Sequence, residues 1–243
     1  MGASDGRMIA ITFALPAESS EIVRRLTHKS ASKSGNVSTL SGRLGMHEVH
    51  IVHTGVGEIM ARSRLNHYLQ DKTPSILISS GFAGATHDDY QLGDLIVARN
   101  FSDPKLVASA ENILREENVR TVVGWTAKSV VDSSKEREQV WTRHEAAAID
   151  MESAPIAEIC GRHGVPMLSL RVLSDTPRHP LPLPPEILFD VERQRTPALP
   201  LLGYVAAHPS SIPKLIRFGQ EVARIRRRLT NALIKVVESD LSV

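Results

Sequence analysis

Three acidic residues follow apolar segments at widely separated points of the chain. They are Glu18 after Met8–Leu15, Glu152 after Ala146–Asp150, and Asp175 after Pro166–Ser174. Carboxyl groups can activate water, stabilise a developing sugar cation or protonate a departing base, which are the tasks in cleaving an N-glycosidic bond to a purine. Taken one at a time, each acid is more typical of a structural role, as a first-turn helix residue or a turn residue.

Apolar runs alternate with amphipathic segments along most of the chain. We predict strands at Met8–Leu15, Val37–Arg43, His47–His53, Ser75–Ser80, Asp94–Ala98, Arg120–Thr126, Ala146–Asp150 and Pro166–Ser174. We predict helices at Glu18–Leu26, from Gly57 to about Gln70, near Leu106–Glu116, near Lys135–His144 and at Ser153–His163. This alternation predicts an α/β protein with three layers (α/β/α) around a central mixed, largely parallel sheet.

The acids are expected at one edge of that sheet. Ligands of open α/β sheets bind beyond the carboxyl ends of the strands. Glu18, Glu152 and Asp175 follow strand ends, and Ser80 is expected to end a strand and to open a small-residue turn over Ser80–Ala85. The sequence therefore predicts that polar side chains from distant segments meet at this edge.

The last third of the chain departs from the alternation. Residues 176–213 contain nine of the fourteen prolines, which excludes a core strand or a long helix there. We interpret this stretch as an ordered excursion, a candidate lid, from a single domain of residues 1–243, because too few residues follow it for a second domain. Apolar residues at three- or four-residue spacing then predict a final helix over residues 212–238.

The final predicted helix is strongly basic. Its cations are Lys214, Arg217, Arg224, Arg226, Arg227, Arg228 and Lys235. A basic amphipathic helix can make peripheral contact with an anionic membrane, whereas the simpler interpretation is a packing helix with a solvated outer face. Nucleic-acid binding is not expected, because the charge is local and no recognition motif accompanies it.

Composition excludes several other classes. The net charge is only +2, the single cysteine (Cys160) rules out an internal disulfide, and the ten histidines show no metal-binding spacing. We therefore expect no metal and no cofactor. The first apolar run, Met8–Leu15, is too short for a signal peptide or a membrane span, so we expect a cytoplasmic protein.

Five sequence blocks occur in a fixed order over roughly residues 8–176. They are Ala14–Glu18, His53–Gly57, Ser79–Ala85 followed by Leu92–Val97, Asp150–Ala154, and Arg171–Asp175. In this order they resemble the nucleoside phosphorylase superfamily and, more closely, its methylthioadenosine/S-adenosylhomocysteine nucleosidase branch. The glycine-containing turns alone are weak signals, and the ordered set is a strong one.

The resemblance implies roles for the matched residues. Glu18 would activate the attacking water, Glu152 would bind the ribose hydroxyls, and Asp175 would serve purine N7. Further substrate contacts are implied for Met151, Ser80, Arg171, Ser174, Gly57, Gly81, Phe82 and, in the segment at the base, Val130. The resemblance also implies a small-molecule nucleoside as ligand, with phosphate as an alternative co-substrate, and a homodimer.

Water and phosphate both stay open as the nucleophile. The bacterial hexameric phosphorylases of this superfamily carry an Arg just before the glycine-rich turn, and the corresponding segment Ile78–Gly81 has none. An ionised Glu18 would also repel phosphate, so hydrolysis is favoured. Arg171 and backbone amides could still hold an anion. The Leu183–Pro185 element and the Pro209–Arg228 region resemble hopanoid-associated phosphorylases, which would imply phosphorolysis of a 5′-substituted adenosine such as adenosylhopane.

The chain also departs from the nucleosidase pattern. The segment after Ala98 is shorter, and the base-pocket segment Thr126–Val131 matches poorly, so the identity of the purine stays open. A non-catalytic nucleoside-binding protein on the same scaffold is the third hypothesis.

Overall fold

The structure, a computed structural model, describes residues 6–183, 187, 208, 212–239 and 241. Its strands are β1 (Met8–Phe13), β2 (Thr27–Ser34), β3 (Val37–Leu44), β4 (His47–His53), β5 (Ile76–Ala85), β6 (Leu95–Ala98), β7 (Arg120–Val122), β8 (Gly124–Thr126), β9 (Ala148–Asp150) and β10 (Met167–Asp175). Its helices are α1 (Pro16–Arg25), α2 (Glu58–Asp71), α3 (Pro104–Ile113), α4 (Ser134–His144), α5 (Ser153–His163) and α8 (Ile212–Glu238). Short 3-10 turns lie at Arg99–Phe101 and Arg115–Glu117.

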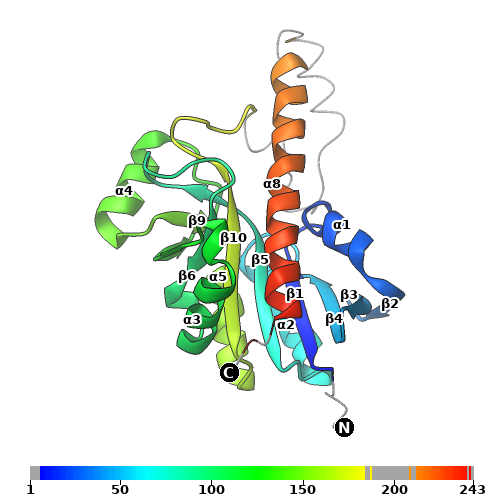
Figure 1. The fold of residues 1–243 in the computed structure, drawn as a ribbon. Helices are drawn as coiled ribbons and strands as arrows, with labels where there is room; N and C mark the ends of the chain where they lie inside the picture. Colours follow the sequence, from blue (N-terminus) through cyan, green and yellow to red (C-terminus); the bar gives the residue numbers. More distant parts are fainter. Residues whose placement is uncertain (1–5, 184–186, 188–207, 209–211, 240, 242–243) are drawn as a thin grey trace.

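The strands form one mixed sheet in the order β2-β3-β4-β1-β5-β10-β6-β7 (Figure 1). The central strands β4, β1, β5 and β10 are parallel, and β3 and β6 run antiparallel to them on either side. The short strands β8 and β9 extend the sheet at the end of β5. Because the four central strands are parallel, their carboxyl ends lie together at one edge.

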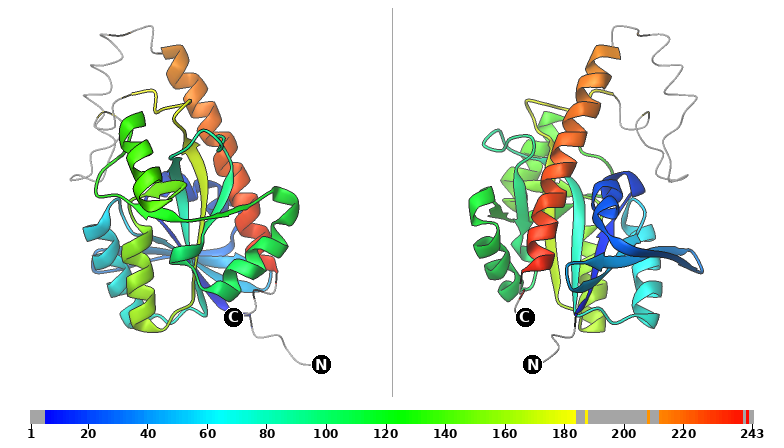
Figure 2. Two further views of the ribbon diagram at one scale, coloured as in Figure 1. Left: turned by 90° about the vertical axis from the view of Figure 1, so that its left-hand side faces the viewer. Right: turned by 45° about the vertical axis from the view of Figure 1, so that its right-hand side comes forward.

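Apolar side chains fill both faces of the sheet. On one face Ile11 packs with Ile22 of α1 and Leu229 of α8. On the other face Ala10 packs with Leu65 of α2, and α5 contributes to the same cluster. The two groups of helices cover opposite faces in Figure 2. This arrangement confirms the prediction of three layers around a mixed sheet.

Helix α8 is buried over its second half only. Ile225 and Leu229 are 2% and 1% exposed, whereas Ile212 and Ile216 in the first turns are 42% and 57% exposed. In Figure 1 these first turns extend past the carboxyl ends of β5 and β10. Most of the proline-rich stretch 176–213 lies outside the described residues, and the predicted excursion with it. Among the described residues, no helix combines the length and apolar character needed to cross a membrane.

The observed strands differ from the predicted ones in three places. Residues 27–34 form β2, which was not predicted because all of its side chains are exposed and give no apolar period; backbone pairing with β3 holds it. Strand β5 continues to Ala85 instead of turning after Ser80, because its outer part pairs with β10 and β9. The predicted strand Arg120–Thr126 divides at Val123 into β7 and β8, which pair with β6 and β9 respectively.

Candidate active site

A cavity of about 280 Å³ opens at the carboxyl ends of β1, β5 and β10. The acidic residues that line it are Glu18, Asp150, Glu152 and Asp175, and no Lys, Arg or His is among its described lining residues. A larger cavity of about 560 Å³, between α1 and the β2–β3 hairpin, has no acidic side chain in its described lining. We therefore place the candidate site in the smaller cavity, where the titratable groups converge.

Backbone amides from two separate elements fix Glu18. It stands in the first turn of α1, which begins at Pro16. Its Oε2 accepts from Leu15 N at 2.8 Å and its Oε1 accepts from Phe82 N at 3.1 Å. A Cβ at Gly81, which has a φ of +143°, would lie 2.8 Å from Glu18 Oε1. Strand β5 therefore approaches the acid this closely only because residue 81 is a glycine.

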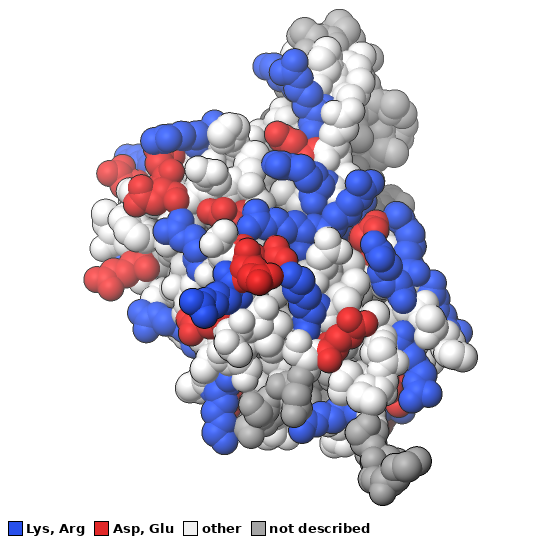
Figure 3. Space-filling model, in the orientation of Figure 1, with Lys and Arg blue, Asp and Glu red and all other residues white. Residues whose placement is uncertain are grey.

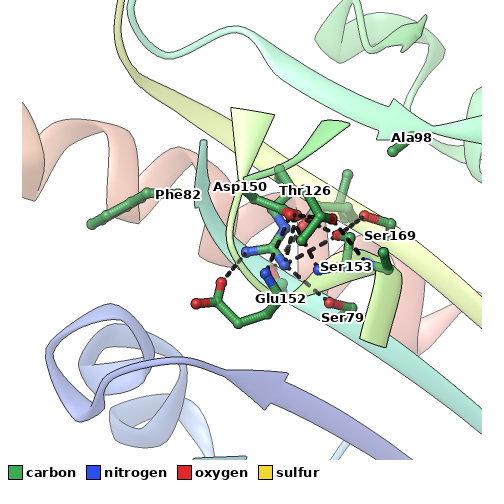
Figure 4. Close-up of polar contacts among 12 residues, drawn as sticks. Ser79, Phe82, Ala98, Thr126, Asp150, Glu152, Ser153 and Ser169 are labelled. Atoms are coloured by element: carbon green, nitrogen blue, oxygen red, sulfur yellow. Dashed lines mark hydrogen bonds and ion pairs between the residues drawn. The ribbon is translucent and has the colours of Figure 1, made fainter. Parts of the chain in front are cut away.

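A buried cation, Arg171 of β10, joins the acids of the turn between β9 and α5. Arg171 Nη2 lies 3.0 Å from Asp150 Oδ2 and donates to Ser79 Oγ and Ser153 Oγ, each at 3.2 Å. Asp150 Oδ1 also accepts from the Thr126 hydroxyl at 3.0 Å. Figure 4 shows Asp150, Ser153 and Ser79 gathered in this network, with Glu152 at its edge. In this network Arg171 provides the countercharge of Asp150, and the two serines orient the Arg171 guanidinium.

Glu152 lies between this cluster and the cavity, which its side chain lines. Its Oε1 accepts from Gly57 N at 2.8 Å, and its Oε2 lies 3.9 Å from Arg171 Nη1. Burial raises the pKa of Glu152 to about 7; Arg171 opposes this shift, and the charges of Asp150 and Glu18 add to it. Burial also raises the pKa of Glu18 above its ordinary value, against the lowering effect of the Leu15 and Phe82 amides. Burial therefore favours the protonated form of both carboxyl groups, compared with an exposed glutamate.

Asp175 lines the cavity at the end of β10. The register of β10 against β5 shifts between Leu173 and Asp175, and such an irregularity re-aims the side chains around it. Ser174 Oγ donates to Asp175 Oδ1 at 2.7 Å, and Arg137 of α4 hydrogen-bonds Asp175 Oδ2. Both carboxylate oxygens are thus already oriented by protein donors.

The rest of the lining is mainly apolar. It includes Phe82, Met151, Val56, Val130 and Leu181, and Val130 is 42% exposed. Apolar walls with a few convergent polar groups are typical of small-molecule sites and suit a flat base and a sugar. Within the described ranges, no three His, Cys, Asp or Glu side chains are arranged to hold a metal ion.

Most of the sequence-predicted site residues meet at this cavity. Those that line it are Glu18, Glu152, Asp175, Met151, Ser174, Phe82 and Val130. Gly57, Gly81 and Arg171 contact the acids of the lining. Ser80 is not brought there, because its buried hydroxyl donates to Leu170 O at 2.9 Å.

Two residues of the site were missed by sequence reasoning. Asp150 precedes Glu152 in the same sequence block, so a carboxylate pair was visible there and was assigned no site role. Arg137 stands in the charged run Lys135–Glu138, which is typical of a solvated helix surface and gave no signal.

Comparisons with known proteins agree with this geometry. A sequence profile of the Phosphorylase superfamily matches residues 8–103 and 99–196. A 5′-methylthioadenosine/S-adenosylhomocysteine nucleosidase from Staphylococcus epidermidis is 24% identical over 196 residues, which cover 69% of this chain and 86% of the relative. A protein of the same name from Shewanella halifaxensis is 22% identical over 204 residues, covering 72% and 89%.

Solved structures share the fold. An S-adenosylhomocysteine nucleosidase from Streptococcus pyogenes in complex with 5-methylthiotubericidin has a TM-score of 0.75 at 22% identity and covers 100% of both chains. A futalosine hydrolase of Helicobacter pylori has a TM-score of 0.63 at 21% identity and covers 70% of this chain and 88% of its own.

Proposed function

The chain belongs to the phosphorylase superfamily, and we propose that it hydrolyses the N-glycosidic bond of an adenine nucleoside. The observation that carries this proposal is that Glu18, Glu152 and Asp175, from distant parts of the sequence, line one cavity. Relatives named as 5′-methylthioadenosine/S-adenosylhomocysteine nucleosidases support both the bond and the base.

Each acid has a task that its surroundings suit. Glu18 takes a proton from the attacking water, and its raised pKa makes it a stronger base than an ordinary glutamate once it is ionised. Glu152, held by Gly57 N, accepts the ribose hydroxyls and stabilises positive charge on the sugar. Asp175 delivers a proton to N7 of the leaving base, where negative charge develops as the bond breaks, and its carboxylate then accepts a hydrogen bond from the new N7–H.

The electrostatics of the cavity favour water over phosphate. Of the four acidic residues in its described lining, Asp150 is paired with Arg171 at 3.0 Å and Asp175 is paired with Arg137, so Glu18 and Glu152 supply the excess negative charge when they are ionised. A phosphate ion beside an ionised Glu18 would therefore face net negative surroundings. The same charge disfavours nucleotides, so we expect a 5′ substituent without net negative charge, such as the methylthio group of methylthioadenosine or the zwitterionic homocysteine of S-adenosylhomocysteine.

Phosphorolysis of a 5′-substituted adenosine is the alternative. Arg171 Nε is buried and has no hydrogen-bond partner among the described protein atoms, so this guanidinium retains a donor for an anion. The charge of the surrounding acids weighs against this alternative.

Product analysis in two buffers tests the proposal. Purified protein is incubated with methylthioadenosine, S-adenosylhomocysteine or adenosine, with and without phosphate. We expect adenine and a free sugar, at rates that do not depend on phosphate. A ribose 1-phosphate product would establish phosphorolysis, and binding without release of adenine in either buffer would identify a non-catalytic nucleoside-binding protein.

Substitution of the three acids tests their roles. We expect Glu18→Gln, Glu152→Gln and Asp175→Asn each to lower kcat by about 10²- to 10⁴-fold. Glu158→Gln, on the solvent side of α5, is the matched control and should keep wild-type turnover. Wild-type rates in all three acid variants would remove the mechanism.

We also propose that the first turns of α8 make peripheral contact with an anionic membrane. Ile212 and Ile216 are exposed there, beside the exposed cations Lys214 and Arg217. Apolar side chains flanked by cations are the pattern of a helix that lies at a lipid surface.

A further inference from the structure

Arg137 is buried although its helix is otherwise polar. It lies in α4, between charged neighbours, and is 1% exposed. A buried guanidinium needs partners for its charge and its donors. Among the buried charged side chains that the structure describes outside the Glu18–Arg171 cluster, it is the one that reaches an acid of the candidate site.

Three contacts hold the Arg137 guanidinium behind Asp175 at the cavity wall. Its Nη2 pairs with Asp175 Oδ2, and its Nη1 donates to Ala85 O at 2.6 Å. Asp132 Oδ1 lies farther away, 3.8 Å from Nη2. Arg137 does not itself line the cavity. Any effect of Arg137 on a substrate must therefore pass through Asp175.

Strand β5 leaves space for this ion pair at one glycine. A Cβ at Gly84 would lie 2.7 Å from Asp175 Oδ2 and 3.1 Å from Arg137 Nη1. Gly84 also pairs with Asp175 in the sheet register. The backbone is thus shaped to let the two charged groups meet beside the cavity.

We propose that Arg137 is a positioning residue, which holds the Asp175 carboxyl in a fixed orientation toward the cavity and so makes the site prefer a 6-aminopurine to a 6-oxopurine. This inference rests on the proposed function. Arg137 donates to one carboxylate oxygen and Ser174 to the other, so each oxygen of this cavity-lining group keeps a lone pair for a ligand. An adenine presents N–H donors at N6 and, once protonated, at N7, whereas a 6-oxopurine places an oxygen against the carboxylate.

A purely structural role explains this pair less well. A buried ion pair adds little net stability compared with apolar packing, because both charges lose their hydration. Here the pair instead fixes the direction of a carboxyl group that lines the cavity. Removing Arg137 would leave the Asp175 carboxyl with one oriented oxygen and no countercharge.

Base binding and turnover test the inference together. Calorimetry with adenine and with hypoxanthine is run on the wild type, Arg137→Met, Arg137→Lys and the control Arg143→Met, an exposed arginine of the same helix. We expect Arg137→Met to weaken adenine binding about tenfold or more and hypoxanthine binding much less, since one charge-assisted hydrogen bond is worth about that factor. Arg137→Lys should restore part of the preference, and Arg143→Met should behave as the wild type.

Turnover gives a second readout. With adenosine and inosine as substrates, kcat for adenosine should fall in Arg137→Met by more than KM changes, and the adenosine-to-inosine ratio of kcat/KM should drop about tenfold. A folded Arg137→Met protein with the wild-type preference in both assays would overturn the inference.

Gly84→Ala covers the case in which Arg137→Met does not fold. It keeps both charges and forces them apart, so it should reduce the same preference, and an unchanged preference would again overturn the inference. If the wild type binds bases selectively but cleaves no nucleoside, the proposed function fails while the role of Arg137 in base recognition is still decided by calorimetry.

Discussion

The carboxyl group of Glu152 lies among charges of both signs, and its ionisation links stability to pH. Burial raises its pKa from 4.5 to about 7 in the folded protein. The folded protein therefore holds a proton that the unfolded chain releases above about pH 4.5. Stability from this group is complete below that pH and is lost as the pH rises to about 7, by up to about 3 kcal/mol.

Glu152→Gln should remove this dependence. We expect the variant to be more stable than the wild type by about 3 kcal/mol at pH 8 and by less than about 1 kcal/mol at pH 5, because glutamine cannot ionise. Urea unfolding at the two pH values measures the difference, with Glu158→Gln as the exposed control. An equal difference at both pH values would show that packing, not ionisation, separates the two proteins.

Gly81→Ala should disable the site with a modest loss of stability. The new Cβ would lie 2.8 Å from Glu18 Oε1 and 3.0 Å from Arg171 Nη1, and the φ of +143° is unfavourable for alanine. We expect kcat to fall at least about 100-fold. Stability should drop by about 1–3 kcal/mol.

Gly161→Ala is the matched control for Gly81→Ala. Gly161 lies in α5, and a Cβ at this position would meet no atom within 4 Å, so alanine should raise stability slightly and leave kcat unchanged. Steady-state kinetics and thermal unfolding report both effects. Normal kcat in Gly81→Ala would mean that Glu18 does not need its present position.

At this scale, sequence reasoning finds residues whose role is local to a motif. Glu18, Glu152 and Asp175 stand in recognisable blocks at strand ends, so their meeting at one cavity was predictable. Ser80 was wrongly placed at the site because β5 was predicted to end there. The strand continues, and its alternation directs Ser79 toward Arg171 and Ser80 toward Leu170 O. Arg137 could not be predicted from the sequence. It lies among other charged residues of a helix, and nothing in that pattern shows which arginine is buried against a distant acid.

Helix α8 divides into a half that packs on the sheet and a half that does not. Leu229 is 1% exposed in the cluster with α1, whereas Ile216 is 57% exposed. We expect Leu229→Ala to lower the unfolding free energy by about 2–5 kcal/mol and Ile216→Ala by less than about 0.5 kcal/mol. Denaturant unfolding of the two variants measures this, and similar losses for both would show that the first half of α8 also has a packed partner.

Elements with a buried face were predictable, and those without one were not. Strands β1 and β10 are buried almost throughout, because helices cover both of their faces. The sequence of β1 is an apolar run broken by Thr12 alone, and that of β10 keeps enough apolar residues around Ser169 and Arg171 to be recognised. Strand β2 has eight exposed residues and forms only because β3 offers backbone partners. Lys29 and Lys33 of β2 are typical of a strand at the exposed edge of a sheet. They are compatible with an edge position, but they do not by themselves predict a strand.

Two regions of the molecule carry charge of opposite sign. Four acidic side chains are in the described lining of the cavity, and Lys and Arg side chains lie along the exposed side of α8 (Figure 3). A net charge of only +2 hides this separation. The acidic cavity disfavours anionic ligands, whereas the basic helix favours an anionic surface. The two regions therefore prefer partners of different charge.

Vesicle sedimentation tests whether α8 binds an anionic membrane surface. We expect the protein to sediment with vesicles containing about one third phosphatidylglycerol and not with phosphatidylcholine alone, and to be released by added salt, which screens the attraction. Lys214→Glu with Arg217→Glu should weaken sedimentation about tenfold or more, since each cation near the surface contributes about 1 kcal/mol. The same charge reversal should leave nucleoside turnover in solution intact, because neither side chain lines the cavity. Equal binding to neutral vesicles, or none to anionic ones, would assign the cations of α8 to an ordinary solvated face.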